Sequence, residues 1–157
     1  GAAGGGAVPP PPAQRGDVAL HAAYPTAAAG DEAVLPITLQ TDGAAVGAVE
    51  VSLALGGGWE LVRAEAGDRL ASGRVLATTA GSTVRAAVLA ADDAAAGTTL
   101  LRLTLRRTAD ADARLAVTGA EVTTADGRPY RVTVDGEVVS PPVRVGAIYL
   151  PALTVTR

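Results

Sequence analysis

Short segments in which apolar and polar residues alternate make up most of this sequence, and turn-forming residues separate them. In 48–55 (AVEVSLAL), Val49, Val51 and Leu53 lie on one side of an extended chain and Glu50 lies on the other. No helical period is long enough to cover a sheet. About nine such strands at close spacing predict an all-β fold, an antiparallel β-sandwich of the jelly-roll type.

Alternation and turn signals together define the expected strands and core. Asp126-Gly127 and Asp135-Gly136 are dipeptides that typically close hairpins. The expected strands lie within 17–23, 33–41, 46–55, 59–64, 83–90, 98–107, 113–124 and 130–139. The apolar sides of these strands predict a sandwich interior formed by Val49, Val51, Leu53, Leu101, Leu103, Leu105, Leu115, Val117, Val132 and Val134.

The composition excludes several classes of site. The 157 residues include no Cys and no Asn, which rules out disulfides, thiolate metal sites and N-glycosylation. A net charge of −3 with scattered arginines gives no electrostatic footprint for nucleic acid. No apolar run approaches the roughly 20 residues of a membrane-spanning helix. The lack of Cys, Met and Asn fits a hot or oxidising environment, and it equally fits a GC-rich genome.

The chain divides into three expected parts. Residues 1–16 are a glycine- and proline-rich tail, which is expected to be extended because consecutive prolines favour polyproline II. Residues 17–140 form the sandwich, and residues 141–157 form a C-terminal strand segment. The small residues at the start indicate a mature, processed N-terminus.

Candidates for catalysis or metal binding are few. His21 is the only histidine and has no recognisable serine motif to serve, so we interpret it as a residue at the sheet surface. Asp110 and Asp112 could offer oxygen ligands to calcium, but their loop lacks the further acidic positions of an EF-hand, and a structural turn is favoured. The sequence therefore predicts no catalytic residue, no cofactor and no metal site.

Several stretches carry a family resemblance. The stretch 31–55 (DEAVLPITLQTDGAAVGAVEVSLAL) looks like the opening of a cohesin domain, and 97–107 (GTTLLRLTLRR) is similar to a later cohesin strand, with Leu105 near the place of the usual Phe. The stretch 115–138 (LAVTGAEVTTADGRPYRVTVDGEV) resembles the closing part of the family pattern. Cohesins are jelly-roll receptor modules of cellulosome scaffolds and bacterial surface proteins, so the resemblance implies this fold and a role in protein association.

Two further comparisons bear on the resemblance. The Y-D-P motif that follows the third cohesin strand is replaced here by LGGGWE at 55–60, so the dockerin-facing surface is not transferred residue by residue. The ending AIYLPALTVTR at 147–157 looks like the YLP segment that closes many secreted proteins of the Chloroflexota. That likeness implies an exported surface protein from a thermophilic phototroph or a relative.

Three functions remain open from the sequence. The leading hypothesis is a non-enzymatic extracellular structural protein that joins other copies of itself into a surface filament or array. The alternative is a cohesin-type receptor that binds a dockerin-like partner and is a monomer in solution. A carbohydrate-binding module or an enzyme is disfavoured, because a sugar site usually needs several aromatic platforms and the chain has only Trp59, Tyr24, Tyr130 and Tyr149.

The filament hypothesis depends on the two terminal segments. The stretch 144–157 is rich in strand-forming residues, and an exposed sheet edge can accept such a segment from another chain. The N-terminal tail has few apolar side chains to fold onto its own domain, so it is expected to lie across a neighbour. The expected self-association residues are Ala7, Val8, Pro9, Pro10, Pro11, Pro12, Ile148, Tyr149, Leu150, Leu153 and Val155.

Overall fold

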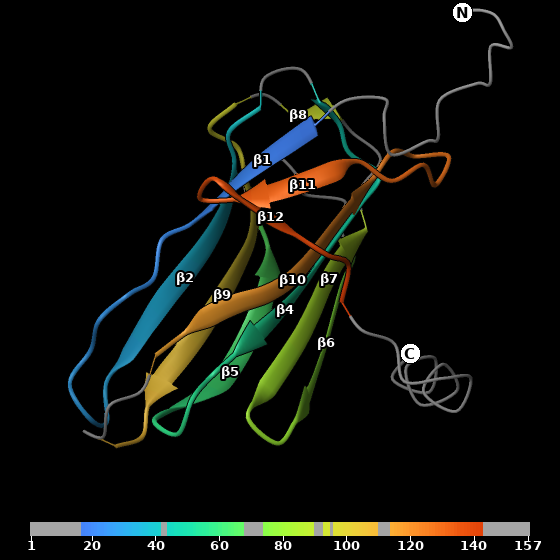
Figure 1. Ribbon diagram of the computed structural model, residues 1–157. Helices are drawn as coiled ribbons and strands as arrows, with labels where there is room; N and C mark the ends of the chain where they lie inside the picture. Colours follow the sequence, from blue (N-terminus) through green and yellow to red (C-terminus); the bar gives the residue numbers. More distant parts are fainter. Residues whose placement is uncertain are drawn as a thin grey trace, which may run out of the picture.

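Two packed β-sheets and a short two-stranded ribbon form the described part of the protein (Figure 1). The computed structural model describes residues 17–41, 44–67, 74–89, 93–94, 96–109 and 114–142, and these ranges contain no helix. The strands are β1 (Asp17–Ala22), β2 (Glu32–Leu39), β3 (Ala44–Ala45), β4 (Ala48–Ala54), β5 (Trp59–Ala66), β6 (Arg74–Ala80), β7 (Thr83–Leu89), β8 (Asp93–Ala94), β9 (Thr99–Arg107), β10 (Ala116–Thr123), β11 (Arg131–Val134) and β12 (Glu137–Val139).

The sheet order confirms the predicted all-β sandwich and corrects one detail of it. One sheet has the order β12-β11-β1-β2-β9-β5, the other has the order β10-β4-β7-β6, and β3 pairs with β8. All of these pairs are antiparallel except β1 with β11, which is parallel. The first strand and a late strand thus lie side by side, as Figure 1 shows for the blue and orange arrows.

The predicted core is confirmed except at two positions. Val49, Leu53 and Leu103 are among the fully buried residues that fill the space between the sheets. The other confirmed core residues are Val51, Leu101, Leu105, Val132 and Val134. Leu115 and Val117 are only partly buried, because Leu115 precedes β10 and β10 lies at a sheet edge.

A bulge explains which β10 residues are buried instead. The pairing of β10 with β4 shifts register between Val117 and Gly119. Such an extra residue reverses the in-and-out alternation of a strand. Ala120 and Val122 are consequently buried, and alternation extrapolated from Val117 fails beyond this point.

The hairpin signals were correct, but the expected strand at 130–139 is two strands. Asp135 and Gly136 have φ values of 50° and 89°, and they join β11 to β12 in the tight turn that the Asp-Gly dipeptide predicts. At Asp126-Gly127 the chain also turns back, since Tyr130 N donates to Val122 O over 2.9 Å. Both turns place the end of the described chain beside β10.

Strand β6 was not predicted from the sequence. Its residues RVLATTA do not alternate between apolar and polar side chains. Ala77 and Thr79 face the interior side, because they pair with the buried residues Ala86 and Val84, yet both are exposed. An inner face that stays open to solvent does not need large apolar residues, so the usual strand signal is missing here.

Candidate functional site

The outer face of the four-stranded sheet carries mainly small side chains. Paired residues on neighbouring strands point to the same side of a sheet, so the register identifies this face. We call it the small-residue face, and it consists of Ala116, Glu121 and Thr123 on β10, Ala48, Glu50, Ser52 and Ala54 on β4, Thr83, Arg85, Ala87 and Leu89 on β7, and Arg74, Leu76, Thr78 and Ala80 on β6. Most of these side chains are half-buried.

An ion pair lies near the middle of the small-residue face. The Arg85 guanidinium donates a hydrogen bond to a carboxylate oxygen of Glu50, and only 12% and 15% of the two side chains are exposed. Beside the pair is a hollow of about 130 Å³, whose lining includes Leu76, Thr78 and Ala87. The other charged residues of the face, Glu121 and Arg74, lie on its two edge strands, β10 and β6.

The opposite outer face has a different chemistry. On the six-stranded sheet, Arg106 donates to Glu32 over 3.0 Å and to Glu60 over 3.1 Å, which links β2, β9 and β5. The hydrogen bond to Glu32 raises the pKa of the Arg106 guanidinium, and the charge of Glu60 acts in the same direction. This face is exposed and its charges are paired within it, as expected of a solvated surface.

The described aromatic side chains do not form one platform. Trp59 is only 6% exposed, and the Arg107 guanidinium lies 5.4 Å from its ring centre. Tyr24 lies elsewhere, since its hydroxyl accepts a hydrogen bond from Val117 N of β10. Tyr130 is half-buried beside β10, and Tyr149 lies outside the described residues. The arrangement gives no support to a sugar-binding site.

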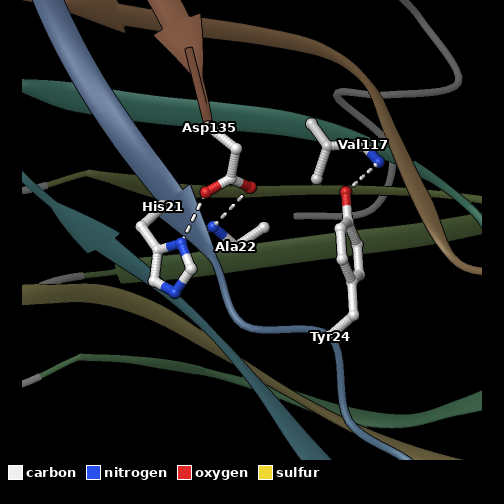
Figure 2. A network of polar contacts seen from close by, with 5 residues as sticks. All are labelled: His21, Ala22, Tyr24, Val117 and Asp135. Atoms are coloured by element: carbon white, nitrogen blue, oxygen red, sulfur yellow. Dashed lines mark hydrogen bonds and ion pairs between the residues drawn. The ribbon is translucent and has the colours of Figure 1, made fainter. Parts of the chain in front are cut away.

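The candidate polar residues from the sequence do not converge on a reactive centre. His21 Nδ1 lies 2.5 Å from Asp135 Oδ1, and Asp135 Oδ2 accepts a hydrogen bond from Ala22 N over 3.3 Å (Figure 2). The carboxylate thereby ties the β11–β12 turn to the end of β1. In the part of the chain that the structure describes, no three His, Cys, Asp or Glu side chains gather as a metal site. Asp110 and Asp112 lie outside that part.

Tyr24 provides a test of this region by titration. Burial raises the pKa of its phenol above 10.0, the Asp135 charge adds to this, and the hydrogen bond from Val117 N opposes both. Because the folded pKa exceeds the unfolded one, the stability that Tyr24 contributes is complete below pH 10 and is lost as pH rises through the folded pKa. We expect Tyr24→Phe to remove one late-titrating phenolate signal from the ultraviolet absorbance, and a titration that is unchanged would contradict this.

The expected self-association residues lie outside the described residues. Ala7 to Pro12 belong to residues 1–16, and Ile148 to Val155 belong to residues 143–157. Within the described ranges, no helix has the length and apolar character needed to cross a membrane.

Sequence reasoning missed the small-residue face as a unit. Glu50 and Arg85 were visible as the polar positions in two apolar alternating strands, AVEVSLA and TVRAAVL. Their meeting on one face depends on β4 pairing with β7, which residue patterns alone do not specify.

Solved structures of cohesins share this fold, although no family model and no curated protein sequence matches the chain. A non-cellulosomal cohesin from Archaeoglobus fulgidus has a TM-score of 0.59 and 15% identity, with 85% of this chain and 97% of that chain covered. The sixth cohesin of Acetivibrio cellulolyticus scaffoldin B, solved with a Cel5 dockerin, has a TM-score of 0.62 and 11% identity, with 80% and 99% covered. A type II cohesin domain from the same organism's cellulosome has a TM-score of 0.61 and 10% identity, with 78% and 94% covered. The chain therefore has a cohesin-like fold.

Proposed function

We propose that this chain is a non-enzymatic, extracellular protein-binding module, and that a dockerin-like protein docks on its small-residue face. The observation that carries the proposal is the largely buried Glu50–Arg85 pair within a surface of mainly small side chains. Two of the similar cohesins, from Acetivibrio cellulolyticus and Clostridium thermocellum, were solved in complex with dockerins, which supports a partner of this kind. The receptor function is thus favoured over the filament as the main activity.

The chemistry of the face explains how such a partner would be recognised. Small side chains such as Ala54 and Ala87 let a partner approach the sheet closely, and they lose little side-chain entropy on binding. The paired charges of Glu50 and Arg85 cost free energy to desolvate, so a partner must offer hydrogen bonds in matching positions. Apolar contact would therefore supply affinity, and the ion pair would supply specificity.

A matched pair of arginine variants tests the proposed docking face. Ala87→Arg places a long charged side chain over the hollow beside Glu50, whereas Val34→Arg places the same side chain on the six-stranded sheet, where Val34 is 45% exposed. We expect a panel of type I and type II dockerins to include at least one that binds the unaltered chain. The affinity for this dockerin should fall roughly tenfold or more with Ala87→Arg and stay unchanged with Val34→Arg. Biolayer interferometry measures both, after thermal melts have shown that the variants fold.

The proposed function is wrong in either of two cases. No dockerin in the panel binds the unaltered chain, or Val34→Arg weakens binding as much as Ala87→Arg does. In the second case the loss of binding is not specific to the small-residue face, and the assignment of docking to that face is wrong.

A further inference from the structure

Three of the four edges of the two larger sheets are protected against pairing with another chain. Exposed edges invite strand addition, and proteins block them with short strands, bulges, charges or covering segments. Strand β12 has only 3 residues. Strand β5 carries a register shift between Leu61 and Arg63, and its exposed side chains include Glu60, Arg63 and Glu65. Each of these edges uses at least one such device.

The β10 edge is covered by other parts of the same chain. Val117 N donates to the Tyr24 hydroxyl over 2.8 Å, and Ala120 N donates to Ser140 O over 3.0 Å. Val122 O accepts from the N–H of Tyr130 over 2.9 Å. The backbone groups along this edge are therefore already used.

Within the part of the chain that the structure describes, strand β6 shows none of these devices. It has 7 residues, pairs with β7 without any register shift, and contains no proline and no charge after Arg74. Among the described residues, no strand pairs with its other side. This edge is long and regular, and no described strand is hydrogen-bonded to it, which are the properties of a site for strand addition.

The turn before β7 shows which β6 backbone groups are directed outward. Gly81 has a φ of 61°, as the first central residue of a type II′ turn requires, and Gly81-Ser82 is a two-residue connection. In such a hairpin the flanking residues, Ala80 and Thr83, bond to each other, and this role alternates along the strand. The residues that direct N–H and C=O away from β7 are therefore Val75, Ala77 and Thr79.

We propose that the β6 edge binds the C-terminal segment of a second copy of this chain, as an added antiparallel strand. The segment 146–156 (GAIYLPALTVT) has the residue types of a strand. The described residues end at Pro142, beside Gly119 of β10, and β10 and β6 are the two opposite edges of one sheet. Donation from the β10 side of one copy to the β6 edge of the next is head-to-tail, and a head-to-tail contact extends into a filament unless the rotation between copies closes a ring.

Pro151 selects the register of the added strand. Proline has no N–H, so its nitrogen must face away from β6 and its neighbours Leu150 and Ala152 must face toward it. In antiparallel pairing, which all other pairs of this sheet use, the side chain of Leu150 then lies on the same side as that of Ala77. Leu150 would cover the inner side of β6, where Ala77 and Thr79 are otherwise exposed.

A proline variant of the full chain tests whether the β6 edge is used. Ala77→Pro removes an N–H that is directed away from β7, so the β6–β7 pairing is preserved. Ala77→Ser is the matched control, because it keeps the N–H at the same position. We expect sedimentation velocity to show concentration-dependent oligomers for the unaltered chain and for Ala77→Ser. Ala77→Pro should need roughly tenfold higher concentration to reach the same oligomer size.

Cysteine cross-linking tests which segment occupies the edge, since the chain has no Cys of its own. Chains with Ala77→Cys are mixed with chains carrying Leu150→Cys, and a disulfide-linked heterodimer is expected under oxidising conditions. Val138→Cys replaces Ala77→Cys as the control, because Val138 is 59% exposed on the other sheet. The heterodimer with Val138→Cys should be absent or minor.

Several outcomes would overturn the proposal. The unaltered chain stays monomeric at all concentrations, Ala77→Pro assembles like the unaltered chain, or Leu150→Cys links equally to Val138→Cys. If Ala77→Cys and Leu150→Cys in one chain form an internal disulfide in a monomer, the segment occupies its own edge and exchange between copies is wrong. These results are independent of docking, because Ala87→Arg alters the small-residue face and is expected to leave self-association unchanged.

Discussion

Leu103→Ala is expected to lower the free energy of unfolding by about 2 to 5 kcal/mol. Leu103 has no exposed surface, and it lies on β9 between Leu35 of β2 and Ala64 of β5. Removing its side chain from this position loses apolar burial and leaves a cavity, because close-packed neighbours relax only in part. Urea denaturation followed by circular dichroism measures the change.

Val34→Ala is the control for the Leu103 prediction. Val34 lies on β2 beside Leu35, but it points to the outer face and is 45% exposed. Its truncation removes little buried surface, so the stability should change by no more than about 0.5 kcal/mol. Equal effects of the two substitutions would show that the two sides of this sheet have been assigned wrongly.

Gly67→Ala is expected to destabilise the fold by about 3 kcal/mol, through a clash rather than a cavity. A Cβ atom at Gly67 would lie 1.8 Å from the carbonyl oxygen of Thr99 and 2.3 Å from its carbon. Both are backbone atoms, so no side-chain rotation can relieve the contact. The hydrogen bond from Gly67 N to Leu100 O, at 3.0 Å, holds the two segments at this separation.

Gly57→Ala is the matched control for Gly67→Ala. A Cβ at Gly57 has no atom within 4 Å, and its φ is not in the left-handed region. The substitution should leave stability unchanged within about 0.5 kcal/mol, or raise it slightly by restricting the unfolded chain. Thermal melts of both variants show whether the loss of stability comes from the contact at Gly67 or from replacing any glycine by alanine. Similar melting temperatures for the two variants would contradict the close approach at Gly67.

The two proposed surfaces belong to one sheet but use different groups. The proposed docking of a dockerin-like protein would use side chains on the small-residue face, whereas the proposed strand addition would use backbone groups at the β6 edge. One sheet could therefore hold a partner on its face while its edge joins a neighbouring copy. The Ala87→Arg and Ala77→Pro variants separate these two contacts.

Local pattern was sufficient for the fold class and for most of the core. Alternation in AVEVSLA and TLLRLTLRR identified β4 and β9, because one side of each strand is buried and the burial period of a strand is two residues. The Asp135-Gly136 turn was also predictable, since Asp and Gly tolerate the φ values of 50° and 89° that it requires. These features depend on neighbours in sequence only.

The sequence by itself thus determined a β-sandwich, its aliphatic core and its hairpin turns. Only the tertiary structure decided the parallel pairing of β1 with β11, the bulge at Val117, the strand β6 and the meeting of Glu50 with Arg85. Each of these depends on which strands become neighbours, and strands far apart in sequence carry no local signal of their partner. The candidate site falls in this second group, because a face and an edge of a sheet exist only once the strands have been ordered.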